Sequence, residues 1–283
     1  MTSKSGERSS GSDEAVWHVA GRDGVGMLRA RYVRQSFPRH SHDCFVVCVN
    51  ERGAHASWYA GTTLVIPERT ITVVPPGEVH TGHPVPGCDW HYRALYPSAE
   101  LFATLALEIG LSADAMPTFP ALFMNDPMLA DAFIRVHRRC EAGRDPLEDE
   151  GSVADLLMDV LQRHAIRAKP RVDRAPPARA IERAMEYIQD CYARPITLDS
   201  VATAAGLSRY AVLRAFRREV GIAPYSFVTQ VRIEQAKRLL RAGTGISGVS
   251  QRVGFADQSH LTRQFKRLVG VTPGAFSRAV RVG

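Results

Sequence analysis

Residues 254–273 read GFADQSHLTRQFKRLVGVTP, and residues 206–224 read GLSRYAVLRAFRREVGIAP. The two stretches share a glycine turn, a capping Ser208 or Asp257, a central phenylalanine and a closing Gly-x-x-Pro, repeated at an interval of 48 residues in the turn and 49 after it. Glycine leaves a helix at low cost in the left-handed conformation, and Ser or Asp accepts hydrogen bonds from free N–H groups where a helix begins. Each stretch therefore predicts a helix-turn-helix unit, whose first helix covers residues 198–205 or 246–253.

The second helix of each unit presents a polar outer face at equivalent positions. The face consists of Arg209, Tyr210, Leu213, Arg214 and Arg217 in the first copy, and of Gln258, Ser259, Thr262, Arg263 and Lys266 in the second. Arginine can make two hydrogen bonds to guanine and glutamine two to adenine, while an apolar side chain can contact a thymine methyl group. Charged residues on one outer helix face are usually only solvated. Two such faces in register favour DNA recognition.

Charge is unevenly distributed along the 283 residues. Residues 179–283 contain 17 Lys and Arg against 7 Asp and Glu, a net charge of +10, whereas residues 1–178 carry a net charge of −3. A strongly basic half joined to a nearly neutral one indicates a polyanionic partner for the basic half. The helix predicted over residues 224–243 would hold the two units in a fixed arrangement, so that they could enter successive major grooves roughly 34 Å apart.

Segment 179–283 resembles the DNA-binding domain of the AraC/XylS family of transcription regulators. The resemblance is carried by LDSVATAAGLSRYAVLRAFRREVGIAPYSFV, RIEQAKRLL and VGFADQSHLTRQFKRLVGVTPGAF. It implies that Tyr210, Leu213 and Arg214, and Gln258, Ser259, Thr262 and Arg263, occupy base-facing positions. It also implies a transcription activator that forms a homodimer and has RNA polymerase as a further partner.

The amino-terminal half begins with β-strand patterns and ends with helical ones. Between residues 25 and 97, short runs of Val, Ile, Tyr, Phe and Thr alternate with Gly, Pro and Asn, which predicts strands. Helices are predicted from residue 99, over 127–141 and over 148–168. The last has an apolar stripe that could pack against a second subunit or against the strands of its own chain, namely Val153, Leu156, Leu157, Val160 and Leu161.

Three histidines stand out in this half, in PRHSHDCFVVCVNERG (38–53) and PPGEVHTGHP (75–84). The two stretches resemble the cupin-like ligand-binding domain of many AraC relatives, a small antiparallel barrel. His40, His42 and His80 stand where cupin enzymes hold a metal, but valines replace the glutamate of the enzymatic pattern. We therefore expect no cofactor, with a divalent metal at these histidines as the alternative. The predicted effector-binding residues are His40, His42, Cys44, Trp58, His80, Trp90 and Tyr92.

Taken together, the sequence predicts an α+β protein of two domains. Residues 1–14 form a disordered tail, residues 15–169 a cupin-like effector-binding domain with dimerisation or linker helices, residues 170–178 a linker, and residues 179–283 a double helix-turn-helix domain. Five scattered cysteines and no long apolar run favour a cytoplasmic protein without membrane contact. The predicted function is a transcription regulator controlled by a small-molecule effector, and not an enzyme. The alternatives are a dioxygenase-like cupin metalloenzyme localised by its basic domain, and a sequence-blind DNA-compacting protein.

Overall fold

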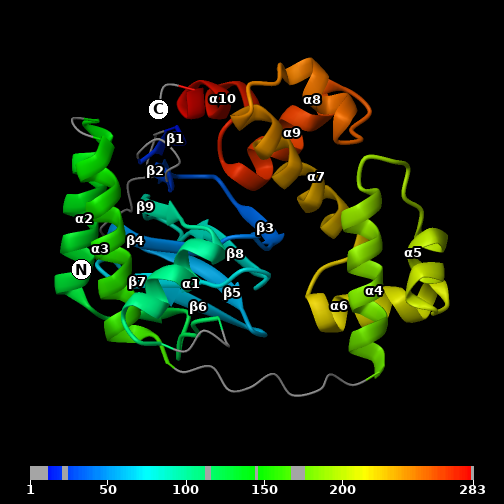
Figure 1. The fold of residues 1–283 in the computed structure, drawn as a ribbon, viewed down its shortest axis with the longest axis horizontal. Coiled ribbons are helices and arrows are strands. Elements are labelled where there is room, and N and C mark those ends of the chain that lie inside the picture. The colour runs from blue at the N-terminus through cyan, green and yellow to red at the C-terminus, as the bar shows by residue number, and fades with distance from the viewer. Residues whose placement is uncertain (1–11, 21–24, 112–115, 144–145, 167–175, 282–283) are drawn as a thin grey trace, which may run out of the picture.

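The computed structural model describes residues 12–20, 25–111, 116–143, 146–166 and 176–281 (Figure 1). The predicted tail lies outside these ranges up to residue 11, and its last residue, Glu14, already belongs to a strand. The predicted linker lies outside them up to residue 175. Its last three residues, 176–178, form the first turn of a helix, so the helical half begins slightly earlier than predicted.

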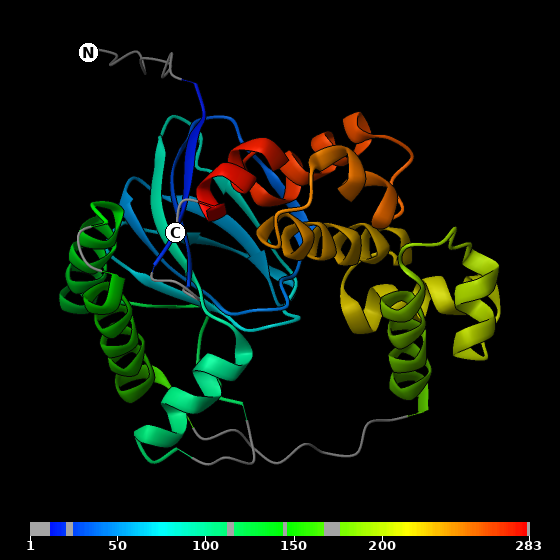
Figure 2. The same ribbon diagram turned by 45° about the horizontal axis from the view of Figure 1, so that its top comes forward.

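The amino-terminal half forms two antiparallel sheets that enclose an interior (Figure 2). One sheet has the order β1-β2-β9-β4-β7-β10 and the other β3-β8-β5-β6. This arrangement confirms the predicted cupin-like fold, although the first strand precedes the predicted strand region. The strands are β1 (Glu14–Val19), β2 (Gly26–Tyr32), β3 (Phe37–His40), β4 (Val46–Arg52), β5 (His55–Tyr59), β6 (Thr62–Ile66), β7 (Ile71–Val74), β8 (His80–Pro84), β9 (Trp90–Tyr96) and β10 (Phe123–Met124).

The larger sheet contributes apolar side chains to a cluster on each of its faces. Successive side chains of a strand point to opposite sides, so one strand can supply both clusters. On β9, Trp90 and Tyr92 face the interior between the sheets, whereas Leu95 belongs to a second apolar cluster on the outer face. Helices α1 (Ala99–Glu108), α2 (Pro127–Glu141) and α3 (Pro146–His164) supply the other side of that second cluster. In Figure 1, α2 and α3 stand side by side next to the sheet.

The apolar stripe of α3 packs inside its own chain. Its five members are at most 3% exposed and contact α1, α2 and the outer face of the sheet. Of the two predicted alternatives, the structure therefore supports the intramolecular one. A dimer would have to use a different surface from the stripe Val153, Leu156, Leu157, Val160 and Leu161.

A buried arginine joins α2 to the sheet. The Arg93 guanidinium donates hydrogen bonds of 2.6 Å to Glu51 on β4 and to Glu141 on α2. It also lies 3.0 Å from Nδ1 of His137. Burial would raise the pKa of Glu141, but its contacts with His137 and Arg93 outweigh burial and lower the pKa to about 2. The ionised carboxylate is thus more stable in the folded chain than in the unfolded one.

Acid is expected to destabilise the chain through Glu141. Because its folded pKa lies below the ordinary 4.5, its contribution is complete above pH 4.5 and is lost as the pH falls from 4.5 toward 2. The shift corresponds to about 3 kcal/mol. Urea unfolding of the native chain and of Glu141→Gln at pH 6 and pH 3 should show that the variant loses less stability across this interval. Equal losses in the two proteins would contradict the assignment.

The carboxyl-terminal half is helical and contains the two predicted helix-turn-helix units, α5–α6 and α8–α9. Ser208 and Asp257 cap the second helices by accepting from the backbone N–H groups of Ala211 and His260. Both second helices end at a left-handed glycine, Gly221 (φ 81°) or Gly270 (φ 84°). The helices are α4 (Pro176–Cys191), α5 (Leu198–Ala205), α6 (Arg209–Val220), α7 (Pro224–Arg241), α8 (Ile246–Arg252), α9 (Gln258–Val269) and α10 (Pro273–Arg281).

The second helix-turn-helix unit shares a hydrophobic core with the sheets. Helix α10 lies along β1 (Figure 2). The rings of Phe276 on α10 and Trp17 on β1 are 5.1 Å apart. At the end of α9, a Cβ added to Gly270 would lie 2.2 Å from the Tyr32 hydroxyl oxygen, so only glycine permits this contact. The predicted domains therefore do not pack as two independent cores.

Helix α7 and the first unit also contact the sheets. The loop after β3 binds α7 twice: Ser41 donates from its backbone N and its Oγ to Gln230, and Arg238 pairs with Asp43 at 2.9 Å. Val79, in the loop before β8, belongs to the apolar cluster of the first unit. Both DNA-binding units are thus held against the amino-terminal half in this structure.

Candidate functional site

Helix α6 presents its predicted base-facing residues to solvent. Arg209, Arg214 and Arg217 are exposed, Tyr210 is 79% exposed, and Leu213 is half-buried. The opposite side of the helix holds the unit together through the buried side chains of Val212, Ala215 and Phe216. One of the arginines is already engaged, since Arg209 pairs with Asp199 on α5 at 2.8 Å.

Helix α9 repeats this arrangement. Gln258, Ser259, Arg263 and Lys266 are exposed and Thr262 is half-buried, while Leu261, Phe265 and Val269 form the buried side. Four of the five predicted residues of each face are therefore exposed, and the fifth, Leu213 or Thr262, is half-buried. An arginine on either face can reach a base edge or a phosphate without first leaving a buried environment.

The interior between the sheets contains a cavity with an aromatic wall. Its lining includes five of the predicted effector-binding residues: His40, His42, His80, Trp90 and Tyr92. Trp90 stacks between His55 and Tyr92, with ring centroids 4.3 and 4.5 Å away. Leu268 and Val269, from the carboxyl-terminal end of α9, form part of the same wall. The end of a recognition helix therefore contributes to the wall of the cavity.

Two predicted effector-binding residues do not line this cavity. His55 and Ser57 of β5 face the cavity, so Trp58, one position further, points to the opposite side of the strand. There it lies under the Arg39 guanidinium, 3.7 Å from the ring centroid, and packs against the first helix-turn-helix unit. Cys44 lies in the loop that contacts α7, and burial raises the pKa of its thiol to about 12.

Sequence reasoning also missed several residues of the cavity wall. Tyr96 lies on the same face of β9 as Trp90 and Tyr92, and the period of two along that strand could have identified it. His55 stacks on Trp90 and bonds to Asn50 at 3.0 Å. No sequence signal predicts this role for Leu268 and Val269, because apolar residues at these positions are expected in any helix that packs against a core.

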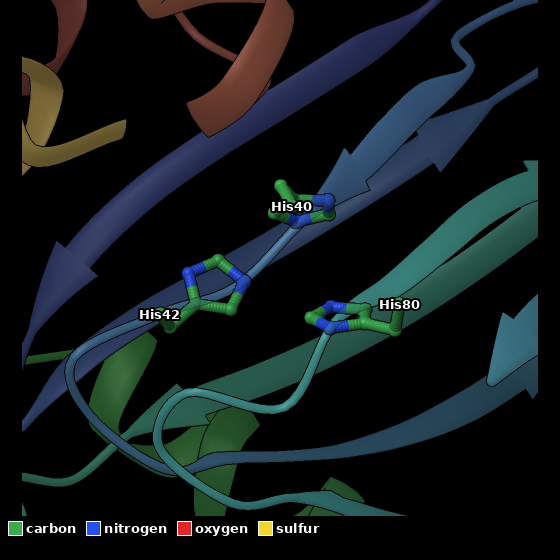
Figure 3. A group of neighbouring side chains, drawn as sticks. All are labelled: His40, His42 and His80. Atoms are coloured by element: carbon green, nitrogen blue, oxygen red, sulfur yellow. The ribbon is translucent and has the colours of Figure 1, made fainter. Parts of the chain in front are cut away.

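The predicted histidines lie close together (Figure 3), and all three line the cavity. His40 ends β3 and pairs directly with His80, which begins β8, while His42 lies in the loop after β3. One ring nitrogen of each lies within 4.8 Å of the others. Burial lowers the pKa of His40 to about 4 and that of His80 to about 3, and lowers that of His42 as well. The imidazoles are therefore neutral at physiological pH.

A second, adjoining cavity lies between the histidines and α7. Its wall includes Trp17, His42, Tyr96, Gln230 and Lys237. Trp17 Nε1 and Gln230 Nε2 are buried and have no hydrogen-bond partner among the described residues. Buried donors without partners are costly, so these N–H groups favour a ligand that supplies an acceptor.

Comparison with known families places both halves of the chain. The AraC-like ligand binding domain family matches residues 24–161, and a helix-turn-helix domain family matches residues 201–279. The uncharacterized HTH-type transcriptional regulator YbfI of Bacillus subtilis is 27% identical over 237 residues, which cover 82% of this chain and 84% of YbfI. The arabinose operon regulatory protein of Escherichia coli is 26% identical over 251 residues, covering 82% and 80%.

Among solved structures, ToxT of Vibrio cholerae is similar over 95% of this chain and 97% of its own, with a TM-score of 0.54 and 11% identity. This likeness shows a shared fold. Among the described residues, no helix combines the length and apolar character needed to cross a membrane. The relatives are transcription regulators and give the predicted metalloenzyme alternative no support. The chain belongs to the AraC family of DNA-binding transcription regulators and carries its ligand-binding domain at the amino terminus.

Proposed function

We propose that the protein is a cytoplasmic transcription activator in which an effector bound between the sheets controls the position of α9 on DNA. The observation that carries the proposal is the wall of the effector cavity, where Leu268 and Val269 belong to the same helix as Arg263. The residues that contact DNA and the residues that contact the effector then lie on different sides of one helix, α9. A homodimer and contact with RNA polymerase complete the proposal, as in other activators of this family.

DNA recognition is assigned to the exposed faces of α6 and α9. Arg214 and Arg263 occupy the same position in the two units and are assigned to base edges, where arginine favours guanine. Gln258 is suited to adenine and Leu213 to a thymine methyl group. Arg217, Arg218, Lys266 and Arg267 lie in the last turns of their helices and are assigned to phosphates.

The cavity indicates the chemical class of the effector. Its wall of Phe37, Trp90, Tyr92 and Tyr96 suits a flat or apolar body. The unpaired N–H groups of Trp17 and Gln230 in the adjoining cavity suit an oxygen acceptor, such as a carboxylate or carbonyl. We therefore assign a small, mostly apolar effector with one oxygen-bearing end.

Such an effector can act only through a difference in affinity between two arrangements of the chain. In the arrangement described here, the end of α9 lines the cavity and Gly270 lies against Tyr32. An effector that fits the cavity of this arrangement stabilises it, whereas one that needs more room displaces Leu268 and Val269 and favours another.

The direct test is a genome-wide footprint of DNA bound by the full chain, with transcript levels of the neighbouring genes measured in cells with and without the protein. The proposal expects a small number of sites that share one sequence, and lower transcript levels in cells that lack the protein. Binding spread evenly over the genome would instead support the DNA-compacting alternative. Higher transcript levels without the protein would contradict activation.

A further inference from the structure

The three histidines that line the cavity have the geometry of a metal site. His40 and His80 face each other across the β3–β8 pair, with ring centroids 4.4 Å apart, and the ring of His42 is 4.8 and 5.3 Å from theirs (Figure 3). In the part of the chain that the structure describes, this is the one group of three or more His, Cys, Asp or Glu side chains close enough to share an ion.

Hydrogen bonds fix which nitrogen two of the three imidazoles, those of His40 and His80, can offer. Nδ1 of His40 lies 2.8 Å from the Pro38 carbonyl oxygen, and Nδ1 of His80 lies 3.1 Å from that of Glu78. A carbonyl oxygen only accepts, so Nδ1 must carry the hydrogen in both rings. Each Nε2 is then left with a free lone pair. Metal-binding histidines are typically held in this way, with the other ring nitrogen donating to a carbonyl or carboxylate.

We propose that His40, His42 and His80 bind one divalent transition-metal ion. Imidazole nitrogens without a carboxylate favour Zn²⁺, Co²⁺, Ni²⁺ or Cu²⁺ over Mg²⁺ and Ca²⁺, which prefer oxygen. Bonds of about 2.0–2.1 Å place tetrahedral ligands about 3.3 Å apart, so the nitrogens, now within 4.8 Å, must close by about 1.5 Å at most. His42 lies in a loop and is the residue best placed to make this movement.

The surroundings of the histidines suit a cation with an open coordination position. The ammonium group of Lys237 near the site is neutralised by Glu234 at 2.7 Å. Because all three histidines line the effector cavity, a fourth position on the ion would face the same cavity as Trp90 and Tyr92. An oxygen of a bound effector could occupy that position.

Residues on both sides of His42 also contact the DNA-binding half. His42 lies between Ser41, which bonds to Gln230, and Asp43, which pairs with Arg238. Movement of His42 toward an ion therefore moves both contacts with α7, the helix that joins the two DNA-binding units. We infer that metal binding changes DNA affinity, a step that rests on the proposed function.

The metal site is tested on the full chain after chelator treatment, by titration with Co²⁺ and Zn²⁺ and by metal analysis of the dialysed protein. We expect one ion per chain. Loss of a hydrogen bond that orients a metal ligand typically lowers metal affinity 10- to 100-fold. His80→Gln removes the ligand itself, so it should lower metal affinity at least about 100-fold. His83→Gln, on the same strand but outside the group, should bind as the native chain does.

Equal affinities of the native chain and of His80→Gln would overturn the metal site. Should His80→Gln fail to fold, as judged by circular dichroism, His42→Gln in the loop gives the same test.

DNA affinity is measured separately, with and without Zn²⁺, on the footprinted sequence. We expect Zn²⁺ to change the affinity of the native chain and of His83→Gln but not of His80→Gln. An ion that binds without this change would overturn the connection to α7, and absence of specific DNA binding in all three proteins would point instead to failure of the proposed function.

Discussion

Replacing Arg214 and Arg263 together by alanine is expected to weaken binding of the full chain to its cognate DNA by about 2–6 kcal/mol. Each arginine assigned to a base should contribute about 1–3 kcal/mol, and losses at distant sites usually add. The two side chains are exposed and lie on different recognition helices, 49 residues apart in sequence. The double variant should also relax sequence preference at two separate base pairs, which selection from random DNA would measure.

Arg218→Ala combined with Arg267→Ala is the matched control. These arginines lie on the same two helices and are exposed, but in the last turn, where phosphate contact is expected. The control should weaken binding to cognate and random DNA alike, and each substitution should lower the slope of the salt dependence by about one unit. If the Arg214 and Arg263 variant also loses equal affinity on both kinds of DNA, its arginines do not read bases.

The helical half was predictable because its signals are local. The capping residues Ser208 and Asp257 and the closing glycines Gly221 and Gly270 fix the two ends of each recognition helix within a dozen residues, and the structure has both helices where the sequence places them. Because the pattern occurs twice, aligning the two copies distinguished the exposed face of each recognition helix from its buried face. Helix α2 was likewise predicted at its observed bounds, and the structure shows Asp126 as the cap at its start.

Contacts between distant segments were not predictable. Strand β1 precedes the predicted strand region, and it packs against α10, more than 250 residues away in sequence. The cavity wall shows the same limit. Tyr96 follows from strand alternation, but Leu268 and Val269 resemble any buried helix positions until the fold brings them to the sheets. No local pattern in one sequence encodes that pairing.

Phe276→Ala is expected to lower the free energy of unfolding by about 3–5 kcal/mol, the usual cost of deleting a buried phenylalanine ring. Phe276 is fully buried, and its ring contacts Phe265 of α9 at 5.5 Å and Trp17 of β1 at 5.1 Å. It therefore joins a recognition helix to the amino-terminal sheets. Its loss should reduce hydrogen-exchange protection in β1 as well as in α9, because both elements lose part of the same core.

Phe227→Ala provides an internal control, because Phe227 is the equivalent residue of the first unit, 49 positions earlier. Its ring contacts the recognition-helix Phe216 at the same 5.5 Å, yet it packs within the cluster of the first unit and touches no aromatic residue of β1. The substitution should weaken protection in α6 while leaving β1 as protected as in the native chain. Loss of β1 protection in both variants, or in neither, would contradict a core shared specifically by the sheets and the second unit. The effector cavity would then need another route to DNA than the end of α9.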